Sequence, residues 1–267
     1  MSLTRTTIPY SNGDVYIGEV NCIKNGKGRM DYTNGDIYEG NWIDDKRNGL
    51  GTIKYKNRDV YNGEFKDDKQ SQGTMRYKDG RVYEGQWEND EINGQGKMRY
   101  SNGDVYEGEL LNGLRNGNGQ GTMRYINGDI YEGQWDENEK NGQGIMTYNN
   151  GDVYDGEWEF DAKHGQGIMR YNNGRIYEGQ WENDNPHGEG TMRHSETNIQ
   201  RGTWDNGRRM RIPGDFEFNA EEDGPLPDTT PEINDYDKHG GSEKNKRKTH
   251  KRKTTKHNTS RKQNKKK

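Results

Sequence analysis

The sequence predicts an all-β repeat protein, and three observations carry this prediction. A Tyr-x-Gly triplet recurs eight times at intervals of 22 to 25 residues, and a period in the twenties is typical of stacked repeat architectures. Within each repeat apolar and polar residues alternate, as in half-buried β-strands. Glycine occurs 38 times, and glycine every few residues strongly disfavours helix. The tyrosines of the eight triplets are Tyr16, Tyr38, Tyr61, Tyr83, Tyr106, Tyr131, Tyr154 and Tyr177.

The fourth repeat, residues 82–104, shows the pattern of a single hairpin. Residues 82–87 (VYEGQW) alternate and are rich in β-forming side chains. Residues 96–100 (GKMRY) alternate again, with Met98 and Tyr100 on one face. Asn102-Gly103 lies between this repeat and the next. Because Asn-Gly between two strands is the strongest short-range hairpin signal, we expect a type I′ turn there.

Fixed columns of residues run along the chain. A large side chain follows two residues after each repeat glycine and shares a strand face with it. We interpret this glycine sterically, since without a Cβ it lets a neighbouring ring lie flat against the backbone. These large side chains are Val20, Trp42, Phe65, Trp87, Leu110, Trp135, Trp158, Trp181 and Trp204. A second column, on the return strand, holds Met30, Ile53, Met75, Met98, Met123, Met146, Met169 and Met192.

The combined pattern, Tyr-x-Gly-x-Trp followed by Gly-x-Gly-x-Met-x-Tyr-x-Asn-Gly-Asp, resembles the MORN repeat (membrane occupation and recognition nexus). The resemblance covers Tyr16 to about Trp204, as eight full copies and a ninth half copy, and residues 8–13 add half of a preceding copy. It implies an elongated single-layer antiparallel ribbon of stacked β-hairpin repeats. About 17 strands at a spacing of about 4.8 Å would give a length of roughly 80 Å.

The repeats depart from this pattern at few places. Arg58 replaces the turn glycine of the second repeat, which predicts a different turn type there. His194, Thr197 and Gln200 replace pattern residues in the last copy, as expected of a terminal repeat that caps an array. The predicted organisation is a partial repeat or cap (1–15), eight repeats plus a half repeat (16–209), a short cap and acidic linker (210–237) and a basic tail (238–267).

Charge is distributed unevenly. The net charge is -4, but residues 238–267 carry +13 and the remainder carries -17. A tail of this composition is expected to be disordered and to seek an anionic target. An anionic membrane, nucleic acid, a nuclear import receptor and the acidic repeats themselves remain open as that target. The candidate anion-binding residues are Lys244, Lys246, Arg247, Lys248, Lys251, Arg252, Lys253 and Lys256.

No motif points to catalysis. The glycine string near Gly117 lacks the following helix that a phosphate loop needs. Glu39, Glu84, Glu107, Glu132 and Glu178 form a column of equivalent positions, whereas a general acid needs a distinct buried environment. No acidic string has calcium-loop spacing, and one cysteine cannot form a disulfide or a cysteine-based zinc site. We therefore expect no enzyme, catalytic residue, cofactor, metal or small-molecule substrate.

The fifth repeat is the longest and carries a candidate partner-binding cluster. It inserts LLNGLRNGN after Glu109, which places Leu110, Leu111 and Leu114 where other repeats have mostly polar residues. An exposed apolar cluster is typical of an interaction site. The alternative is that the loop folds these leucines onto its own hairpin.

The sequence thus predicts a non-catalytic scaffold or adaptor that binds an unidentified protein partner through the ribbon. The polybasic tail adds an anionic target or nuclear import. The alternative is a peripheral membrane tether that binds anionic phospholipids. Residues 1–8 lack an apolar signal core, and no segment approaches the ~20 apolar residues that span a bilayer. We expect a soluble intracellular protein that is not secreted, in the cytoplasm with the nucleus as a further compartment.

Overall fold

The computed structural model describes residues 2–116 and 120–210, and these residues form one antiparallel β-sheet of twenty strands. The strands are β1 (Thr4–Pro9), β2 (Val15–Val20), β3 (Lys24–Asp31), β4 (Ile37–Ile43), β5 (Lys46–Lys54), β6 (Val60–Lys66), β7 (Lys69–Arg76), β8 (Val82–Glu88), β9 (Glu91–Arg99), β10 (Val105–Leu111), β11 (Leu114–Arg115), β12 (Gln120–Arg124), β13 (Ile130–Asp136), β14 (Glu139–Thr147), β15 (Val153–Glu159), β16 (Ala162–Arg170), β17 (Ile176–Glu182), β18 (Asn185–Arg193), β19 (Ile199–Asp205) and β20 (Arg208–Arg209).

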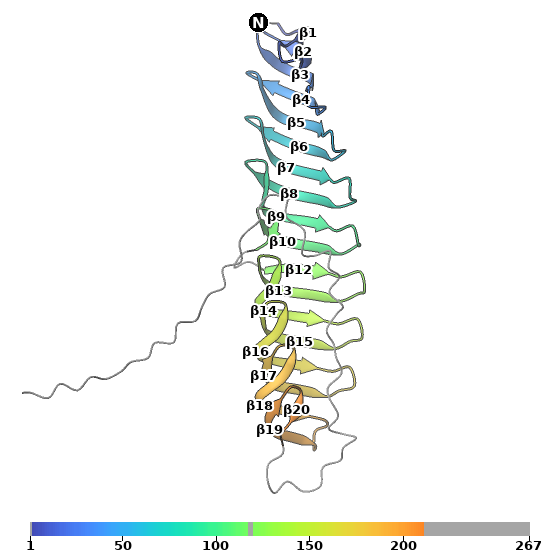
Figure 1. The fold of residues 1–267 in the computed structure, drawn as a ribbon, viewed down its shortest axis with the longest axis vertical. Helices are drawn as coiled ribbons and strands as arrows, with labels where there is room; N and C mark the ends of the chain where they lie inside the picture. Colours follow the sequence, from blue (N-terminus) through green and yellow to red (C-terminus); the bar gives the residue numbers. More distant parts are fainter. Residues whose placement is uncertain (1, 117–119, 211–267) are drawn as a thin grey trace, which may run out of the picture.

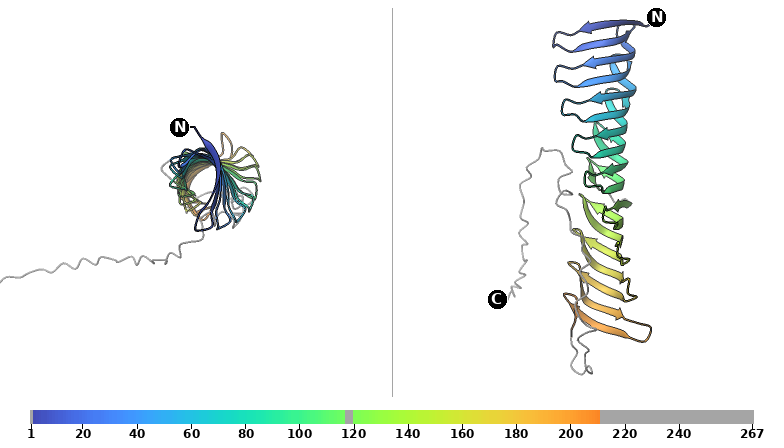
Figure 2. Two further views of the ribbon diagram at one scale, coloured as in Figure 1. Left: turned by 90° about the horizontal axis from the view of Figure 1, so that it is seen from above. Right: turned by 90° about the vertical axis from the view of Figure 1, so that its right-hand side faces the viewer.

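Each strand pairs with the next one along the chain except at the short β11, which pairs with β10 alone, while β10 continues its pairing with β12. The result is the open, single-layer ribbon of stacked hairpins that the resemblance implied (Figure 1). Seen along the long axis, successive strands are rotated about that axis (Figure 2), which is the accumulated twist of neighbouring β-strands. Apart from the short β11, every strand between the two ends of the sheet has hydrogen-bonded neighbours on both sides, so each repeat is stabilised mainly by the repeats beside it.

The two edges of the ribbon use different turns, and the turn type predicted for Asn102-Gly103 is wrong. A type I′ turn needs two residues with positive φ, but only Gly103 has one there, at 102°. The Tyr100 carbonyl accepts from Gly103 N–H, and Tyr100 N–H donates to the Asp104 carbonyl. This is a three-residue loop that ends in a left-handed glycine. The type I′ turns lie on the opposite edge, at 44–45, 67–68, 89–90, 112–113, 137–138, 160–161, 183–184 and 206–207.

The different turn type predicted for the second repeat is also wrong. Arg58 adopts the left-handed conformation, at φ 79°, that the equivalent glycines have. Its N–H donates to the Tyr55 carbonyl at 2.9 Å, and Tyr55 N–H donates to the Asp59 carbonyl at 2.9 Å, as in the other turns. The stacked neighbours therefore impose the turn geometry even where the residue is not glycine.

The steric interpretation of the repeat glycines is confirmed. Each repeat tyrosine ring lies across a cross-strand pair of glycines, such as Gly85 and Gly96 beneath Tyr83. A Cβ added at Gly96 would lie 2.4 Å from Tyr83 Cε2. The phenol hydroxyl reaches beyond the glycines and donates to the Gln86 carbonyl at 2.8 Å. All eight repeat tyrosines are buried in this way.

The tyrosines and the large residues that follow them form an aromatic row in two stretches. Tyr38, for example, makes edge-to-face contacts with Trp42 at 5.2 Å in its own repeat and with Phe65 at 5.1 Å in the next. Such contacts stabilise by about 0.5–1.5 kcal/mol beyond their burial. The row is interrupted at the fifth repeat, where the buried Leu110 occupies the aromatic position.

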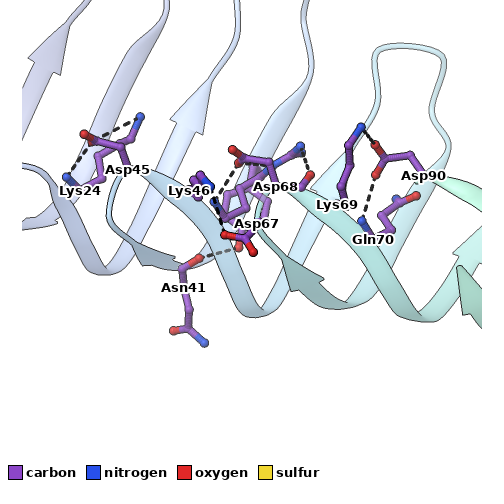
Figure 3. Close-up of polar contacts among 11 residues, drawn as sticks. Lys24, Asn41, Asp45, Lys46, Asp67, Asp68, Lys69, Gln70 and Asp90 are labelled. Atoms are coloured by element: carbon purple, nitrogen blue, oxygen red, sulfur yellow. Dashed lines mark hydrogen bonds and ion pairs between the residues drawn. The ribbon is translucent and has the colours of Figure 1, made fainter. Parts of the chain in front are cut away.

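A second inner row contains cations that lie over the aromatic rings in five repeats, at Lys24, Arg47, Arg115, Lys140 and Lys163. Lys140 Nζ lies 4.7 Å from the Trp158 ring centroid, and its own exposed fraction is only 3%. At the turn of the next repeat, Asp161 accepts the Lys140 backbone N–H at 2.8 Å. The same arrangement links Lys24 to Asp45 (Figure 3). The cations therefore belong to the packing between repeats, where cation–π contacts replace part of their lost hydration.

Candidate protein-binding surface at the hairpin tips

Each type I′ turn is flanked by two residues that face each other across the hairpin, on the face opposite the tyrosine core. We call these two residues the tip pair. Among the described residues the tip pairs are Ile43–Lys46, Lys66–Lys69, Glu88–Glu91, Leu111–Leu114, Asp136–Glu139, Glu159–Ala162, Glu182–Asn185 and Asp205–Arg208. In this set only the pair of the fifth repeat, Leu111–Leu114, has large apolar side chains on both strands.

The local sequence explains how the fifth repeat builds this tip. Asn112 and Gly113 have φ angles of 51° and 77°, so they form the Asn-Gly type I′ turn that the sequence had suggested at another place. Asn112 N–H donates to Asn93 Oδ1 at 3.0 Å, which holds the turn against the preceding repeat. The turn therefore sets Leu111 and Leu114 directly opposite each other.

The three leucines predicted as a cluster are divided between the two faces of the sheet. Leu110 is buried, with 1% exposed, and fills the core position that other repeats give to an aromatic ring. Leu111 is 49% exposed, and Leu114 is half-buried. Because successive side chains along a strand point to opposite faces of the sheet, the adjacent residues Leu110 and Leu111 lie one in the core and one on the surface. Only Leu111 and Leu114 are available to a partner.

The surroundings of this apolar pair are acidic. The tip pair of the preceding repeat is Glu88–Glu91, and that of the following repeat is Asp136–Glu139. Glu88, Glu91 and Asp136 are exposed. The geometry thus offers a small apolar contact between two acidic groups, which suits an apolar side chain flanked by basic residues.

The family of the chain is shown by a match to the model of the MORN repeat. Eight consecutive matches cover residues 16–37, 38–60, 61–80, 83–105, 106–130, 131–153, 154–174 and 177–195. The chain belongs to the MORN-repeat family. Beyond the last match this MORN-repeat chain continues with β19, in which Gln200 takes the place of the repeat tyrosine and pairs with Met192. The ninth half copy is therefore part of the sheet.

Two solved structures are similar to parts of this MORN-repeat chain at low sequence identity. The TCP10 domain of Danio rerio CPAP, in complex with a peptide of STIL, has a TM-score of 0.43 and 9% identity, over 76% of this chain and all of that chain. The TCP domain of Drosophila melanogaster SAS-4, in complex with a proline-rich motif of Ana2, has a TM-score of 0.39 and 12% identity, over 66% of this chain and 90% of that chain. No curated protein matches the sequence.

Two further groups of titratable side chains are the glutamate column considered above and the histidines His164 and His187, which occupy equivalent positions. The glutamate column lies on the exposed face, and a side-chain hydrogen bond from Lys97 lowers the pKa of Glu107 below its usual value. His164 and His187 lie 3.4 Å and 3.3 Å from carboxylate oxygens of Glu159 and Glu182. In the described part of the chain, no three His, Cys, Asp or Glu residues are grouped as a metal site would require. The same part contains no helix able to cross a bilayer.

Several predicted features lie outside the described residues. These are the anion-binding tail from Lys244 to Lys256, residues 211–237 of the predicted cap and linker, and Gly117 of the glycine string. Met210, the first residue of that cap, is 52% exposed.

Proposed function

We propose that this MORN-repeat protein is a non-catalytic scaffold that binds a protein partner at the Leu111–Leu114 tip. Nearly all the repeated residues that resemble functional motifs are used in the architecture. The glycines accommodate tyrosine rings, the inner cations cover tryptophans, and the turn aspartates accept backbone N–H groups of adjacent repeats. The residues left for recognition of a partner are therefore those that differ from the repeat pattern.

The observation that carries this proposal is the exposed apolar tip between two acidic tips. Leu111 presents about half of its surface to solvent at the edge of an open ribbon, and the adjacent hairpins expose Glu88 and Asp136. Central apolar groups with a charged rim are typical of protein interfaces. A partner segment with an apolar side chain between basic residues would satisfy both features.

The basic tail supplies a second contact in this proposal. Residues 238–267 carry a net charge of +13, so they attract an anionic target such as nucleic acid, or serve nuclear import from an intracellular location. A peripheral membrane tether is the alternative, with about 1 kcal/mol per basic residue near an anionic surface. The repeats themselves oppose it, because residues 1–237 carry -17 and are repelled by anionic lipid.

Affinity capture with the full chain and matched variants tests the proposal. We expect Leu111→Ser with Leu114→Ser to lose the captured partner at an unchanged melting temperature, because both residues lie outside the core. Ile126→Ser is the control, since Ile126 is 68% exposed on the opposite edge. Truncation after residue 237 should leave that partner bound. Flotation of the truncated protein with anionic vesicles would instead favour the membrane tether.

A further inference from the structure

The edge opposite the hairpin tips carries a cluster of basic residues in the second and third repeats. Lys56, Asn57, Arg58 and Lys78 line a shallow pocket of about 600 Å³ formed by two adjacent turns. At the position of Lys56 and Lys78, the other described turns have Ser11, Thr33, Ser101, Ile126, Asn149, Asn172 and Ser195. The position of Arg58 is glycine in six of these turns and in the Lys78 turn, and it is Thr197 in the last turn. The cluster is therefore a local departure from the repeat and not part of its architecture.

Arg58 places a guanidinium at a backbone position that favours glycine. Its φ of 79° is a conformation that glycine adopts freely, and it costs other residues about 1–2 kcal/mol. Strain of this kind is retained mainly where the side chain has a use. The turn needs no arginine, because its hydrogen bonds are the same as those of the glycine turns.

The three cations of the pocket have no counter-charge. Within the described residues, the side chains of Lys56, Arg58 and Lys78 make no ion pair or hydrogen bond. The residue after the tyrosine that begins a turn packs over the turn of the preceding repeat. Lys56, for example, follows Tyr55 and packs over Gly35, with its Cδ atom 3.2 Å from the position that a Cβ on Gly35 would occupy. The same repeat geometry places Lys78 beside Arg58. Like charges that line one pocket repel each other, and a bound anion would offset this repulsion.

The nearby carboxylates are engaged elsewhere. Asp36 accepts the Lys56 backbone N–H at 2.8 Å, and Asp59 accepts the Lys78 backbone N–H at 2.8 Å. Their second oxygens accept from asparagine side chains of the same turns. Asp79 pairs with Arg81 at 2.9 Å. These acids hold the turns in place and leave the cations of the pocket free for a ligand.

We infer that this pocket binds a phosphoryl group on a protein segment, such as a phosphoserine. A guanidinium binds two phosphate oxygens at once, and two ammonium groups beside it neutralise the dianion. The turns on either side of the pocket, residues 33–35 and 101–103, carry no basic residue, so the cluster of turn cations is limited to two adjacent turns. Such a focused site fits a single phosphoryl group better than an anionic membrane plane, which the -17 of residues 1–237 would repel. The site is separate from the Leu111–Leu114 tip and goes beyond the function proposed for that tip.

An NMR titration of the full-length protein tests this site. The protein is titrated with a short Gly-Ser peptide that carries one central phosphoserine, and separately with the same peptide without phosphate, while backbone and arginine side-chain signals are followed. We expect shifts at Lys56, Arg58 and Lys78 with the phosphorylated peptide only. Arg58→Gly should weaken binding about tenfold, since it removes a charge-assisted bidentate contact. Lys56→Ser and Lys78→Ser should also weaken it. Arg99→Thr, which removes an exposed positive charge from β9, should not.

Two outcomes would overturn the inference: no shift with the phosphorylated peptide, or equal weakening by Arg99→Thr. Vesicles with phosphatidic acid provide a second arm, with phosphatidylcholine vesicles as the blank. Binding to the first type that depends on Arg58, without binding of the peptide, would assign the pocket to lipid and contradict the protein ligand. The Leu111→Ser, Leu114→Ser variant should bind the phosphopeptide normally, so the two sites can fail separately.

Discussion

The ring of Tyr83 lies so close to Gly96 that no other residue fits at position 96: a Cβ there would lie 2.4 Å from Tyr83 Cε2. The same relationship recurs in every repeat, which explains why a chain with only 25% hydrophobic residues folds. Its core consists of aromatic rings laid on bare backbone, and each tyrosine or tryptophan buries on the order of 150–250 Å².

Gly96→Ala should therefore destabilise the ribbon severely. The added methyl group must displace the buried Tyr83 ring or spread two paired strands, and we expect a loss of about 3 kcal/mol or more. Urea denaturation measures this loss. Lys97→Ala, on the exposed face of the same strand, is the matched control and should change stability by less than about 0.5 kcal/mol. Similar losses for both variants would contradict the packing described here.

Arg58→Gly should stabilise the protein. Glycine relieves the left-handed strain, and part of this gain is offset by the greater freedom of glycine in the unfolded chain. A net gain of about 0.5–1 kcal/mol is expected in urea denaturation. Gly80→Ala makes the opposite change at an equivalent turn, where φ is 96°, and should be destabilising. A loss of stability in Arg58→Gly would mean that the arginine is needed for the fold.

Leu110→Trp should strengthen the interrupted aromatic row. The new ring would lie between Tyr83 and Tyr106, and the Gly96 carbonyl would be placed to accept its indole N–H, as Gly121 does for Trp135 at 3.2 Å. Two added edge-to-face contacts give an expected gain of about 1 kcal/mol after the cost of repacking. Thermal unfolding checks this, and Leu110→Ala should lose about 2–5 kcal/mol. A lower melting temperature for Leu110→Trp would show that leucine is required by the fifth repeat.

The buried tyrosines should make the protein sensitive to alkali. Burial raises the pKa of the repeat tyrosine Tyr16 and of two tyrosines that begin turns, Tyr55 and Tyr77, to about 12. It raises the pKa of the other repeat tyrosines, such as Tyr83 and Tyr154, further. In the unfolded chain these phenols ionise near pH 10. Their contribution to stability is fully present below about pH 10 and is lost as the pH rises towards their folded pKa values, by about 1.4 kcal/mol per pH unit per tyrosine.

The corresponding measurement is a pH titration at constant temperature, in which ultraviolet absorbance follows the ionisation of the tyrosines and circular dichroism follows the β-structure. We expect the buried phenols to ionise together with the loss of β-structure above about pH 10. A control unfolded in urea should titrate smoothly near pH 10. Independent ionisation of all the tyrosines near pH 10 in the folded protein would contradict their burial.

Much of the fold could be predicted from the sequence because every structural requirement recurs eight times. The positions of Tyr83, Gly96 and Met98 follow from a period of two within strands and a period in the twenties along the chain. The turn type at Asn102-Gly103 could not be predicted, because the dipeptide fits both kinds of hairpin loop and neighbouring repeats choose between them. The geometry of Arg58 depends on the same neighbours.

The candidate site was only partly predictable. A leucine cluster was visible in the sequence, but the register decides that Leu110 enters the core while Leu111 and Leu114 face each other outside it. The inner cations were missed, since a lysine such as Lys140 looks like a surface residue until its place over Trp158 is known. The pocket around Arg58 was also missed. Its signal was present as three basic residues in turn positions that are neutral elsewhere.

Site-specific photo-crosslinking tests most directly the central claim that recognition occurs where the repeat pattern is broken. A photoreactive amino acid is placed at Leu111 of the full chain, and at Ile126 and Glu84 as exposed controls on the other edge and on the outer face. We predict one prominent protein adduct from position 111, competed by unmodified protein and absent from positions 126 and 84. Equal adducts from all three positions, or an adduct from position 84 without one from 111, would contradict the claim.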